Sequence, residues 1–281
     1  MISTILITGC STGIGRHCAL RLRECGYRVL ATARREEDVA ALQALGLESF
    51  LLDLDSSESI ARGVDHALEL TDGRLDALFN NGAYGQPGAV EDLSRDVLRA
   101  QFETNLFGWV ELTNRVIPVM RRQGYGRIVM NSSVLGLVAM KYRGAYNASK
   151  FALEGITDTY RQELQGSGIE ISLIEPGPIT SAFRRNALAA FTRNIDHTRS
   201  AHAETYAGVL KRLAAGEEEG SRFTLPPEAV FKALQHALES SRPRARYYVT
   251  LPTWLLACLR RLLPARWLDR LLMRAAEQEN S

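Results

Sequence analysis

The 281-residue sequence predicts an α/β fold: a doubly wound, parallel sheet of seven strands in a single domain with a C-terminal helical extension. Short runs that are β-branched-rich or continuously apolar alternate with longer segments of helical period, as expected for strands buried on both faces. In addition, no repeat, low-complexity tract or linker rich in Pro, Gly or Ser divides the chain. We therefore assign residues 1–250 to one domain and 251–281 to the extension.

The individual elements follow from this alternation. The predicted strands are STILIT (3–8), RVLATA (28–33), SFLL (49–52), LDALF (75–79), RIVMN (127–131), IEISLIE (169–175) and RYYVT (246–250). Amphipathic segments predict helices at 14–25, 36–45, 57–71, 95–122, 146–166 and 227–240. Right-handed crossovers between parallel strands place such helices on both faces of the sheet. Residues 182–226 predict no strand, and an insertion of this size is often a lid or a binding loop.

Composition excludes several classes of protein. The chain is 46% hydrophobic and 23% charged, so it can bury a core, and a net charge of +2 without a basic block argues against a nucleic-acid partner. No signal peptide and no apolar run of about 18 residues is visible. The four cysteines and five histidines show no ligand spacing, so we expect no metal site. Reduced cysteines favour a cytoplasmic location.

A glycine-rich loop, ITGCSTGIG, joins the first strand to the first helix. Gly9, Gly13 and Gly15 would let the backbone turn tightly and approach a pyrophosphate at the helix N-terminus. The spacing differs from the usual G-x-G-x-x-G, so a glycine-rich turn without a ligand is the alternative. The strand before it and the helix after it favour a Rossmann-type dinucleotide site.

The end of the second strand indicates which dinucleotide. NAD sites often carry an acidic residue there, whereas this sequence has Arg34 and Arg35. A guanidinium suits a 2′-phosphate, which favours NADP(H) over NAD. Alternatively, both arginines cap a solvated turn.

Tyr146 and Lys150 lie one helical turn apart and so share a helix face. A free phenol has a pKa of about 10, and a nearby ammonium lowers it. The pair could therefore act as a general acid and base. The alternative is an ordinary surface pair.

Together these motifs resemble the short-chain dehydrogenase/reductase family over nearly the whole chain. The resemblance implies a catalytic tetrad of Asn105, Ser133, Tyr146 and Lys150, in which Asn105 holds a water that links Lys150 to solvent. It also implies cofactor contacts from Gly9, Ser11, Thr12, Gly13, Ile14, Gly15, Arg34, Asp53, Leu54, Asn81, Gly82, Tyr146, Lys150, Pro176, Gly177, Ile179 and Ser181.

Two positions depart from the family pattern. Gly82 and Ala83 reverse the usual order, but both residues are small, so a close backbone approach should survive. Ser181 stands where threonine is usual, beside Thr180, so which hydroxyl faces the cofactor stays open.

The sequence is most similar to steroid- and retinol-dehydrogenase-like members and to bacterial NADP-dependent aldehyde reductases. This implies lipophilic substrates. Leu135, Val138, Met140, Tyr142 and Phe183 could line an apolar pocket, although several could be ordinary core.

We therefore expect an NADP(H)-dependent enzyme that reduces aldehydes or ketones, with Tyr146 as the general acid. The alternatives are a steroid- or retinol-type alcohol dehydrogenase and a dinucleotide sensor without turnover. The family resemblance implies a homodimer or homotetramer that pairs through helices 95–122 and 146–166. The basic, tryptophan-containing C-terminus is expected to be a lid or a packing element in preference to a peripheral membrane contact.

Overall fold

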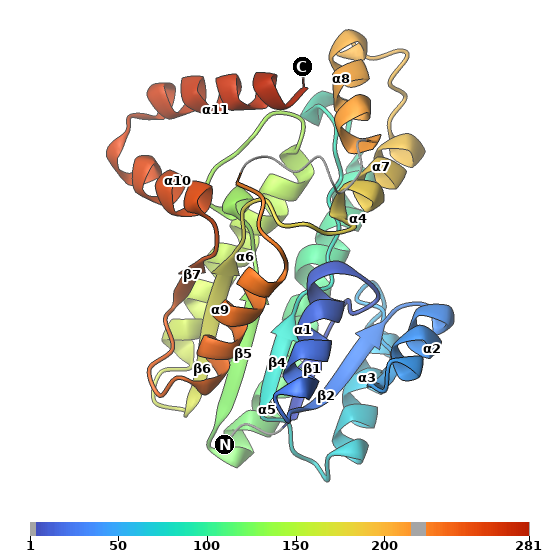
Figure 1. Cartoon of the computed structure of the whole chain (residues 1–281), viewed down its shortest axis with the longest axis vertical. Helices are drawn as coiled ribbons and strands as arrows, with labels where there is room; N and C mark the ends of the chain where they lie inside the picture. The colour runs from blue at the N-terminus through green and yellow to red at the C-terminus, as the bar shows by residue number, and fades with distance from the viewer. Residues whose placement is uncertain (1–3, 215–222, 281) are drawn as a thin grey trace.

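Seven parallel strands form one twisted sheet in the order β3-β2-β1-β4-β5-β6-β7, which confirms the predicted α/β class (Figure 1). The computed structural model describes residues 4–214 and 223–280; residue 3 of the first predicted strand, residues 215–222 of the predicted lid and residue 281 lie outside them. The strands are β1 (Thr4–Ile7), β2 (Arg28–Ala33), β3 (Glu48–Leu51), β4 (Ala77–Asn80), β5 (Gly126–Asn131), β6 (Ile169–Glu175) and β7 (Arg246–Tyr248).

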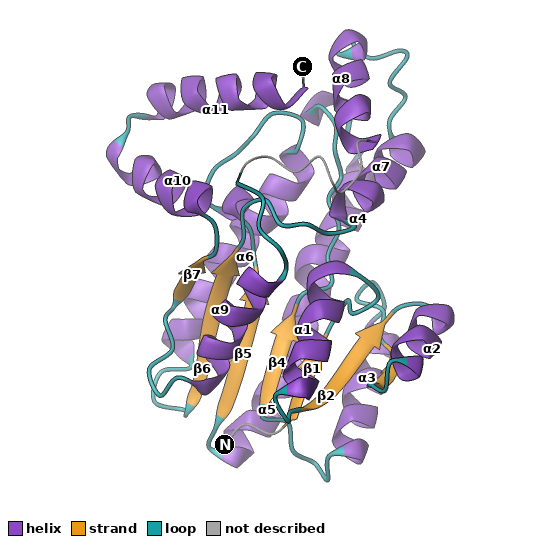
Figure 2. Cartoon of the chain, viewed as in Figure 1, coloured by secondary structure: helices purple, strands orange, loops and turns teal. Residues whose placement is uncertain are grey.

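Alternating side chains divide the core into two layers. Ile5 and Ile7 of β1 pack on one face against α1 (Gly13–Glu24), α2 (Glu36–Ala44) and α9 (Glu228–Glu239). Leu6 points to the other face, which is covered by α3 (Ser57–Leu70), α5 (Gly108–Gln123) and α6 (Gly144–Glu163). Figure 2 shows these helix layers around the sheet. Because both faces are covered, the strands are continuously apolar, which is the pattern that predicted them.

The predicted helix 95–122 is interrupted. The structure has α4 (Arg95–Phe102), a π-helical turn from Glu103 to Phe107, and then α5. A π-turn inserts one extra residue into the helix and is frequent at functional sites. Here it contains Asn105, so the expectation of one regular helix is wrong at the predicted site residue.

A second group of helices lies beyond the carboxyl ends of the strands (Figure 1). α7 (Phe183–Asn194) and α8 (Ala203–Ala214) occupy the segment predicted to contain no strand, and they share a small core with Ala89, Leu93 and Ala145. The C-terminal extension forms α10 (Leu251–Leu262) and α11 (Ala265–Asn280), separated at Pro264. Two short 3-10 turns, Val90–Asp92 and Val134–Gly136, complete the upper part.

Along the chain, β2 and β3 are added on one side of β1, and β4 to β7 are added on the other side. The direction of strand addition therefore switches between β1 and β4. In open parallel sheets, ligands bind beyond the carboxyl ends of the strands at such a switch point. The glycine loop after β1 and the NNG segment after β4 meet at this position.

Candidate active site

The loops after β1 and β4 touch, and glycines make this contact possible. Gly9 has a φ of +69°, and a Cβ atom there would lie 2.5 Å from the Cα atom of Gly82. A Cβ on Gly15 would collide with the carbonyl oxygen of Gly9. The reversed Gly82–Ala83 order therefore preserves the close approach, as expected.

The N-terminus of α1 is open to an anionic group. Thr12 caps the helix without a side-chain hydrogen bond, and the first turn contains no acidic residue. The N–H groups of a first helical turn lack partners within the helix and attract phosphates. Ser181 lies across from this turn, since a Cβ atom on Gly13 would be 3.1 Å from the Cβ atom of Ser181. The loop thus fits a pyrophosphate in shape and in charge.

The two arginines after β2 differ in their contacts. Arg35 caps α2 and pairs with Glu37 at 2.9 Å and with Asp38 at 2.8 Å. Arg34 is exposed and forms no ion pair with any residue of 4–214 or 223–280. Its charge nevertheless acts on Asp55 and Tyr84 at the switch point. Arg34 is therefore the one of the two that is available to a ligand.

A polar network connects the glycine loop to α6, the helix of Tyr146 and Lys150. The Asn81 amide donates to the carbonyl oxygens of Thr8 and Gly9, at 3.0 and 3.2 Å. Its Oδ1 accepts from Asn131 Nδ2 at 2.9 Å. The Asn131 carbonyl oxygen in turn accepts from Lys150 Nζ at 2.7 Å. These hydrogen bonds fix the relative positions of the loops after β1, β4 and β5, which were expected to surround a cofactor.

The predicted catalytic side chains converge at the start of α6. Tyr146 is 9% exposed, and the Ser133 side chain, which follows β5, lies close enough to the phenol to lower its pKa. Lys150, one turn along α6, is fully buried beneath the tyrosine and lies over the Trp109 ring, 4.4 Å from its centre. The phenol and the serine hydroxyl are therefore close enough to bind one substrate oxygen.

The charges in this group differ from the sequence-based expectation. Burial raises the pKa of Tyr146 to about 12, although the Ser133 hydrogen bond and the charge of Arg143 lower it. Burial also lowers the pKa of Lys150 to about 7, against the effect of Glu154. Lys150 Nζ bonds to the Asn131 carbonyl and lies 5.8 Å from the centre of the Tyr146 ring. Desolvation therefore outweighs the lowering of the phenol's pKa that was expected from the Lys150 ammonium.

Asn105 is fully buried in the π-turn. Its amide donates to the Tyr84 carbonyl oxygen at 2.9 Å and to Ser149 Oγ at 3.3 Å, and its Oδ1 accepts from Tyr84 N–H at 3.2 Å. The asparagine therefore joins the π-turn to the loop after β4 and to α6, one residue before Lys150. It makes no direct contact with the lysine.

The remaining predicted cofactor residues surround the same loops. Asp53 and the buried Leu54 follow β3, and the Asp53 backbone N–H is held by Ser59. Pro176 follows β6, and its carbonyl oxygen accepts from Val134 N–H at 2.8 Å, beside Ser133. A Cβ on Gly177 would collide with the hydroxyl of Thr250. Ile179 bridges to Leu225, Ser11 and Ile14 are half-buried, and Ser181 Oγ lies 3.4 Å from the Ile179 carbonyl oxygen.

The predicted pocket residues separate into different environments. Phe183 is 37% exposed and stacks edge-on against Tyr146, with 5.2 Å between ring centres. Leu135 and Val138 are buried. Tyr142 packs with His202 and Tyr206 of the α7–α8 group, and Met140 lines a separate cavity of about 360 Å³ against α11. Of the five residues, only Phe183 makes a ring contact with Tyr146 within the described structure.

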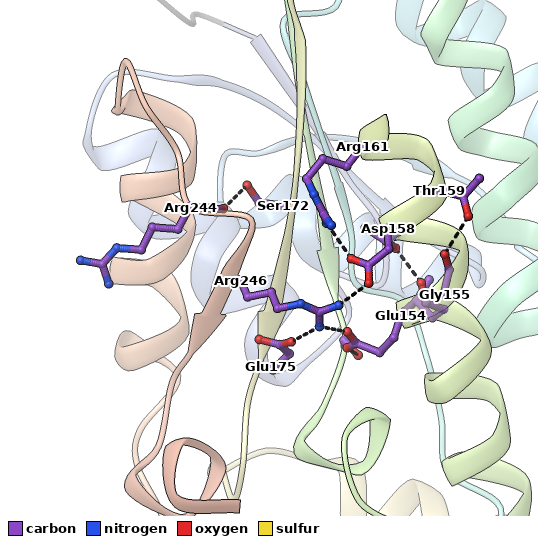
Figure 3. Close-up of polar contacts among 12 residues, drawn as sticks. Glu154, Gly155, Asp158, Thr159, Arg161, Ser172, Glu175, Arg244 and Arg246 are labelled. Carbon is purple, nitrogen blue, oxygen red and sulfur yellow. Dashed lines mark hydrogen bonds and ion pairs between the residues drawn. The ribbon is translucent and has the colours of Figure 1, made fainter. Parts of the chain in front are cut away.

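A buried charge cluster lies one turn beyond Lys150 (Figure 3). The Arg246 guanidinium from β7 contacts the carboxylates of Glu154, Glu175 (2.7 Å) and Asp158 (2.7 Å). Glu154 also accepts a hydrogen bond from Ser132, the neighbour of Ser133. Burial, followed by the charge of Glu154, raises the pKa of Glu175 to about 8. The cluster therefore connects the end of β6 to the helix that carries Tyr146 and Lys150.

Sequence reasoning missed the residues that support the site. Trp109 follows Asn105 by four residues and lies under Lys150, and Glu154 follows Lys150 by four. Both positions could have been found from the i, i+4 spacing. Asn131 and Arg246 had no such signal, because their partners are far away in the sequence. Among the described residues, no group of His, Cys, Asp or Glu could hold a metal ion.

Comparisons with known proteins agree with this arrangement. The sequence profile of the family described as short chain dehydrogenase matches residues 3–190. The chain is 44% identical over 272 residues to the "Uncharacterized oxidoreductase YbbO" of Escherichia coli (strain K12), covering 97% of this chain and 94% of the relative.

Two human relatives are more distant. Identity to "17-beta-hydroxysteroid dehydrogenase type 1" is 33%, covering 88% of this chain and 77% of the relative. Identity to "Retinol dehydrogenase 8" is 35%, covering 86% and 80%.

Among solved structures, a short chain dehydrogenase/reductase from Burkholderia phymatum in complex with NAD superposes with a TM-score of 0.76 at 25% identity, covering 93% of this chain and 92% of that one. The fold, the family profile and the relatives lead to the same conclusion. The chain is an oxidoreductase that belongs to the short-chain dehydrogenase family.

Proposed function

We propose that the protein is an NADP(H)-dependent reductase of lipophilic aldehydes or ketones, with Tyr146 as the proton donor. The observation that carries the proposal is the Ser133–Tyr146 pair beyond β5, whose helix is joined to the glycine loop through hydrogen bonds of Lys150, Asn131 and Asn81. The NAD-bound structural relative supports a nicotinamide dinucleotide as the cofactor.

The bound dinucleotide would supply the hydride, and the protein would manage the proton. Ser133 donates a hydrogen bond to the substrate oxygen and stabilises the negative charge that develops there. Tyr146 transfers its phenolic proton to that oxygen, which becomes the alcohol. Lys150, in its charged form, stabilises the resulting phenolate. Asn105 would position the water through which the site regains its proton.

The glycine loop would hold the pyrophosphate, and Asp53 and Leu54 would face the adenine. Pro176, Gly177, Ile179 and Ser181 would border the nicotinamide. The segment 182–226 would serve as the substrate lid. We further propose a homodimer or homotetramer in the cytoplasm; the four free cysteines support a reducing compartment.

The substitution Arg34→Ala is expected to weaken NADPH binding roughly 10- to 100-fold and to leave NADH binding nearly unchanged, since a charge-assisted bond to the 2′-phosphate is worth about 1.5–3 kcal/mol. Titration with both nucleotides measures this. Arg35→Ala is the matched control, because its guanidinium is already paired with Asp38. Equal losses for NADPH and NADH in Arg34→Ala would contradict the 2′-phosphate assignment.

The activity itself is tested by following NADPH absorbance with medium-chain aldehydes, retinal and ketosteroids, and NADP⁺ with the corresponding alcohols. Faster reduction than oxidation is expected. Faster oxidation would favour an alcohol dehydrogenase, and NADPH binding without turnover across all substrates would favour a sensor.

A further inference from the structure

The C-terminal helices contact the rest of the protein along narrow sides. In α10, Thr253 and Ala257 are buried. In α11, Leu272 and Ala276 are buried, facing α8 and the 139–141 loop. Much of the remaining surface of both helices is exposed, at the end of the molecule that lies beyond the carboxyl ends of the strands (Figure 1).

These exposed sides carry large apolar side chains. Leu251, Leu255 and Leu262 recur at a helical spacing that places them on one stripe of α10, and Leu262 is 77% exposed. Trp254 (56% exposed) lies beside the stripe, and Trp267 (64% exposed) and Leu271 share a side of α11. We name this set the C-terminal surface: Leu251, Trp254, Leu255, Leu262, Trp267 and Leu271. Large exposed apolar side chains in such a group indicate an interaction site.

The charge around this surface is positive. Residues 251–281 contain five arginines, at 260, 261, 266, 270 and 274, and three acidic residues, Asp269, Glu277 and Glu279. All five arginines are exposed. On α11, Arg270 and Arg274 lie on the side that carries Trp267 and Leu271. A second copy of the chain would bring like charges together, whereas an anionic partner complements them.

We propose that the C-terminal surface docks on an anionic lipid bilayer. Tryptophan and leucine side chains enter the interface between headgroups and acyl chains, and the arginines bind lipid phosphates. In the described part of the chain, every helix is too short or too polar to span a bilayer, so both helices lie flat on it. Docking of this kind is independent of cofactor choice and of the direction of the reaction.

The proposal also places the substrate side of the molecule next to the lipid. The inner side of α11, with Leu272 and Met273, borders the cavity of about 360 Å³ that Ala139 and Met140 line from the other side. That loop continues from Ser133 along the chain. The surface that would face the lipid is therefore close in the chain to the proposed catalytic serine, a consequence that rests on the proposed function.

The proposal is tested by sedimenting the 281-residue protein with two kinds of vesicle. One is phosphatidylcholine alone, and the other is phosphatidylcholine mixed with the anionic lipid phosphatidylglycerol. Binding to the anionic vesicles, weakened by salt, is expected. Arg270→Gln combined with Arg274→Gln should weaken it roughly 30-fold. Trp254→Ser combined with Trp267→Ser should weaken it at least about tenfold. Leu45→Ser, at an exposed leucine that ends α2, is the control and should bind normally.

Tryptophan fluorescence gives an independent readout. The chain has three tryptophans, and Trp109 is fully buried, so a blue shift on adding anionic vesicles reports Trp254 and Trp267. Lack of binding to anionic vesicles overturns the proposal, as does equal binding by the tryptophan variant. A dimer in light scattering that the same substitutions dissociate would identify a second copy as the occupant and also overturn it. Turnover of a water-soluble aldehyde should be unchanged in these variants, so this test stands apart from that of the catalytic assignment.

Discussion

Replacing Tyr146 with phenylalanine is expected to lower the rate of carbonyl reduction by about 10²- to 10⁴-fold, because a positioned general acid contributes that much. The ring remains packed against Phe183, and the cofactor loops are unchanged, so NADPH affinity should stay within about threefold, a free-energy change below 1 kcal/mol. Steady-state rates together with nucleotide titration separate the two effects.

Tyr142→Phe provides the matched control. Tyr142 also lies beyond β5, but its hydroxyl is directed to His202 at 3.5 Å in the α7–α8 group. We expect the control to retain most of its turnover. Normal turnover in Tyr146→Phe would show that another group donates the proton. Because burial holds the pKa of Tyr146 at about 12, the phenol stays protonated through neutral pH, as a donor must.

The substitution Arg246→Met is expected to lower the free energy of unfolding by about 3–5 kcal/mol, the usual cost of removing one partner from a buried ion cluster. Glu175 is fully buried, and one of its carboxylate oxygens, Oε2, has no hydrogen-bond partner within the described structure. Without Arg246, Glu154 and Glu175 would face one another with no shared cation (Figure 3). Urea denaturation above pH 8, where Glu175 is ionised in the unmodified protein, measures the loss.

The same cluster sets a pH dependence. Burial raises the pKa of Glu175 from 4.5 to about 8, so between these values the folded state binds more protons than the unfolded state. Stability therefore falls as pH rises through this window. Removing Arg246 raises the pKa further, so the deficit of the variant should shrink as pH is lowered from 8 toward 5, and adding Glu175→Gln should restore part of the loss.

Arg161→Met is the control for this prediction. Arg161 pairs with Asp158 at 2.6 Å, but about a third of both side chains is exposed, and such pairs contribute about 0–1 kcal/mol. Equal losses in Arg161→Met and Arg246→Met, or a deficit independent of pH, would contradict the buried-charge account.

Local sequence patterns were sufficient for the fold. The seven strands and the helices between them followed from apolar runs and helical periods, since burial on both faces of a sheet requires such runs. The glycine loop and the Tyr146–Lys150 pair could be predicted because the residues of each are close together in the chain. The family resemblance supplied Asn105 and Ser133, which have no local signal.

The tertiary structure alone decided the charge states and the supporting contacts. Lys150 bonds to the Asn131 carbonyl, Tyr146 is buried, and Asn105 lies in a π-turn. Arg35 is paired, whereas Arg34 has no ion pair with a described residue. Folding also brings Arg246 to Glu154 across 92 positions of the chain. Desolvation and ion pairing depend on residues that are distant in the sequence and become neighbours only when the sheet assembles. A local sequence pattern therefore cannot predict these contacts or the charge states that follow from them.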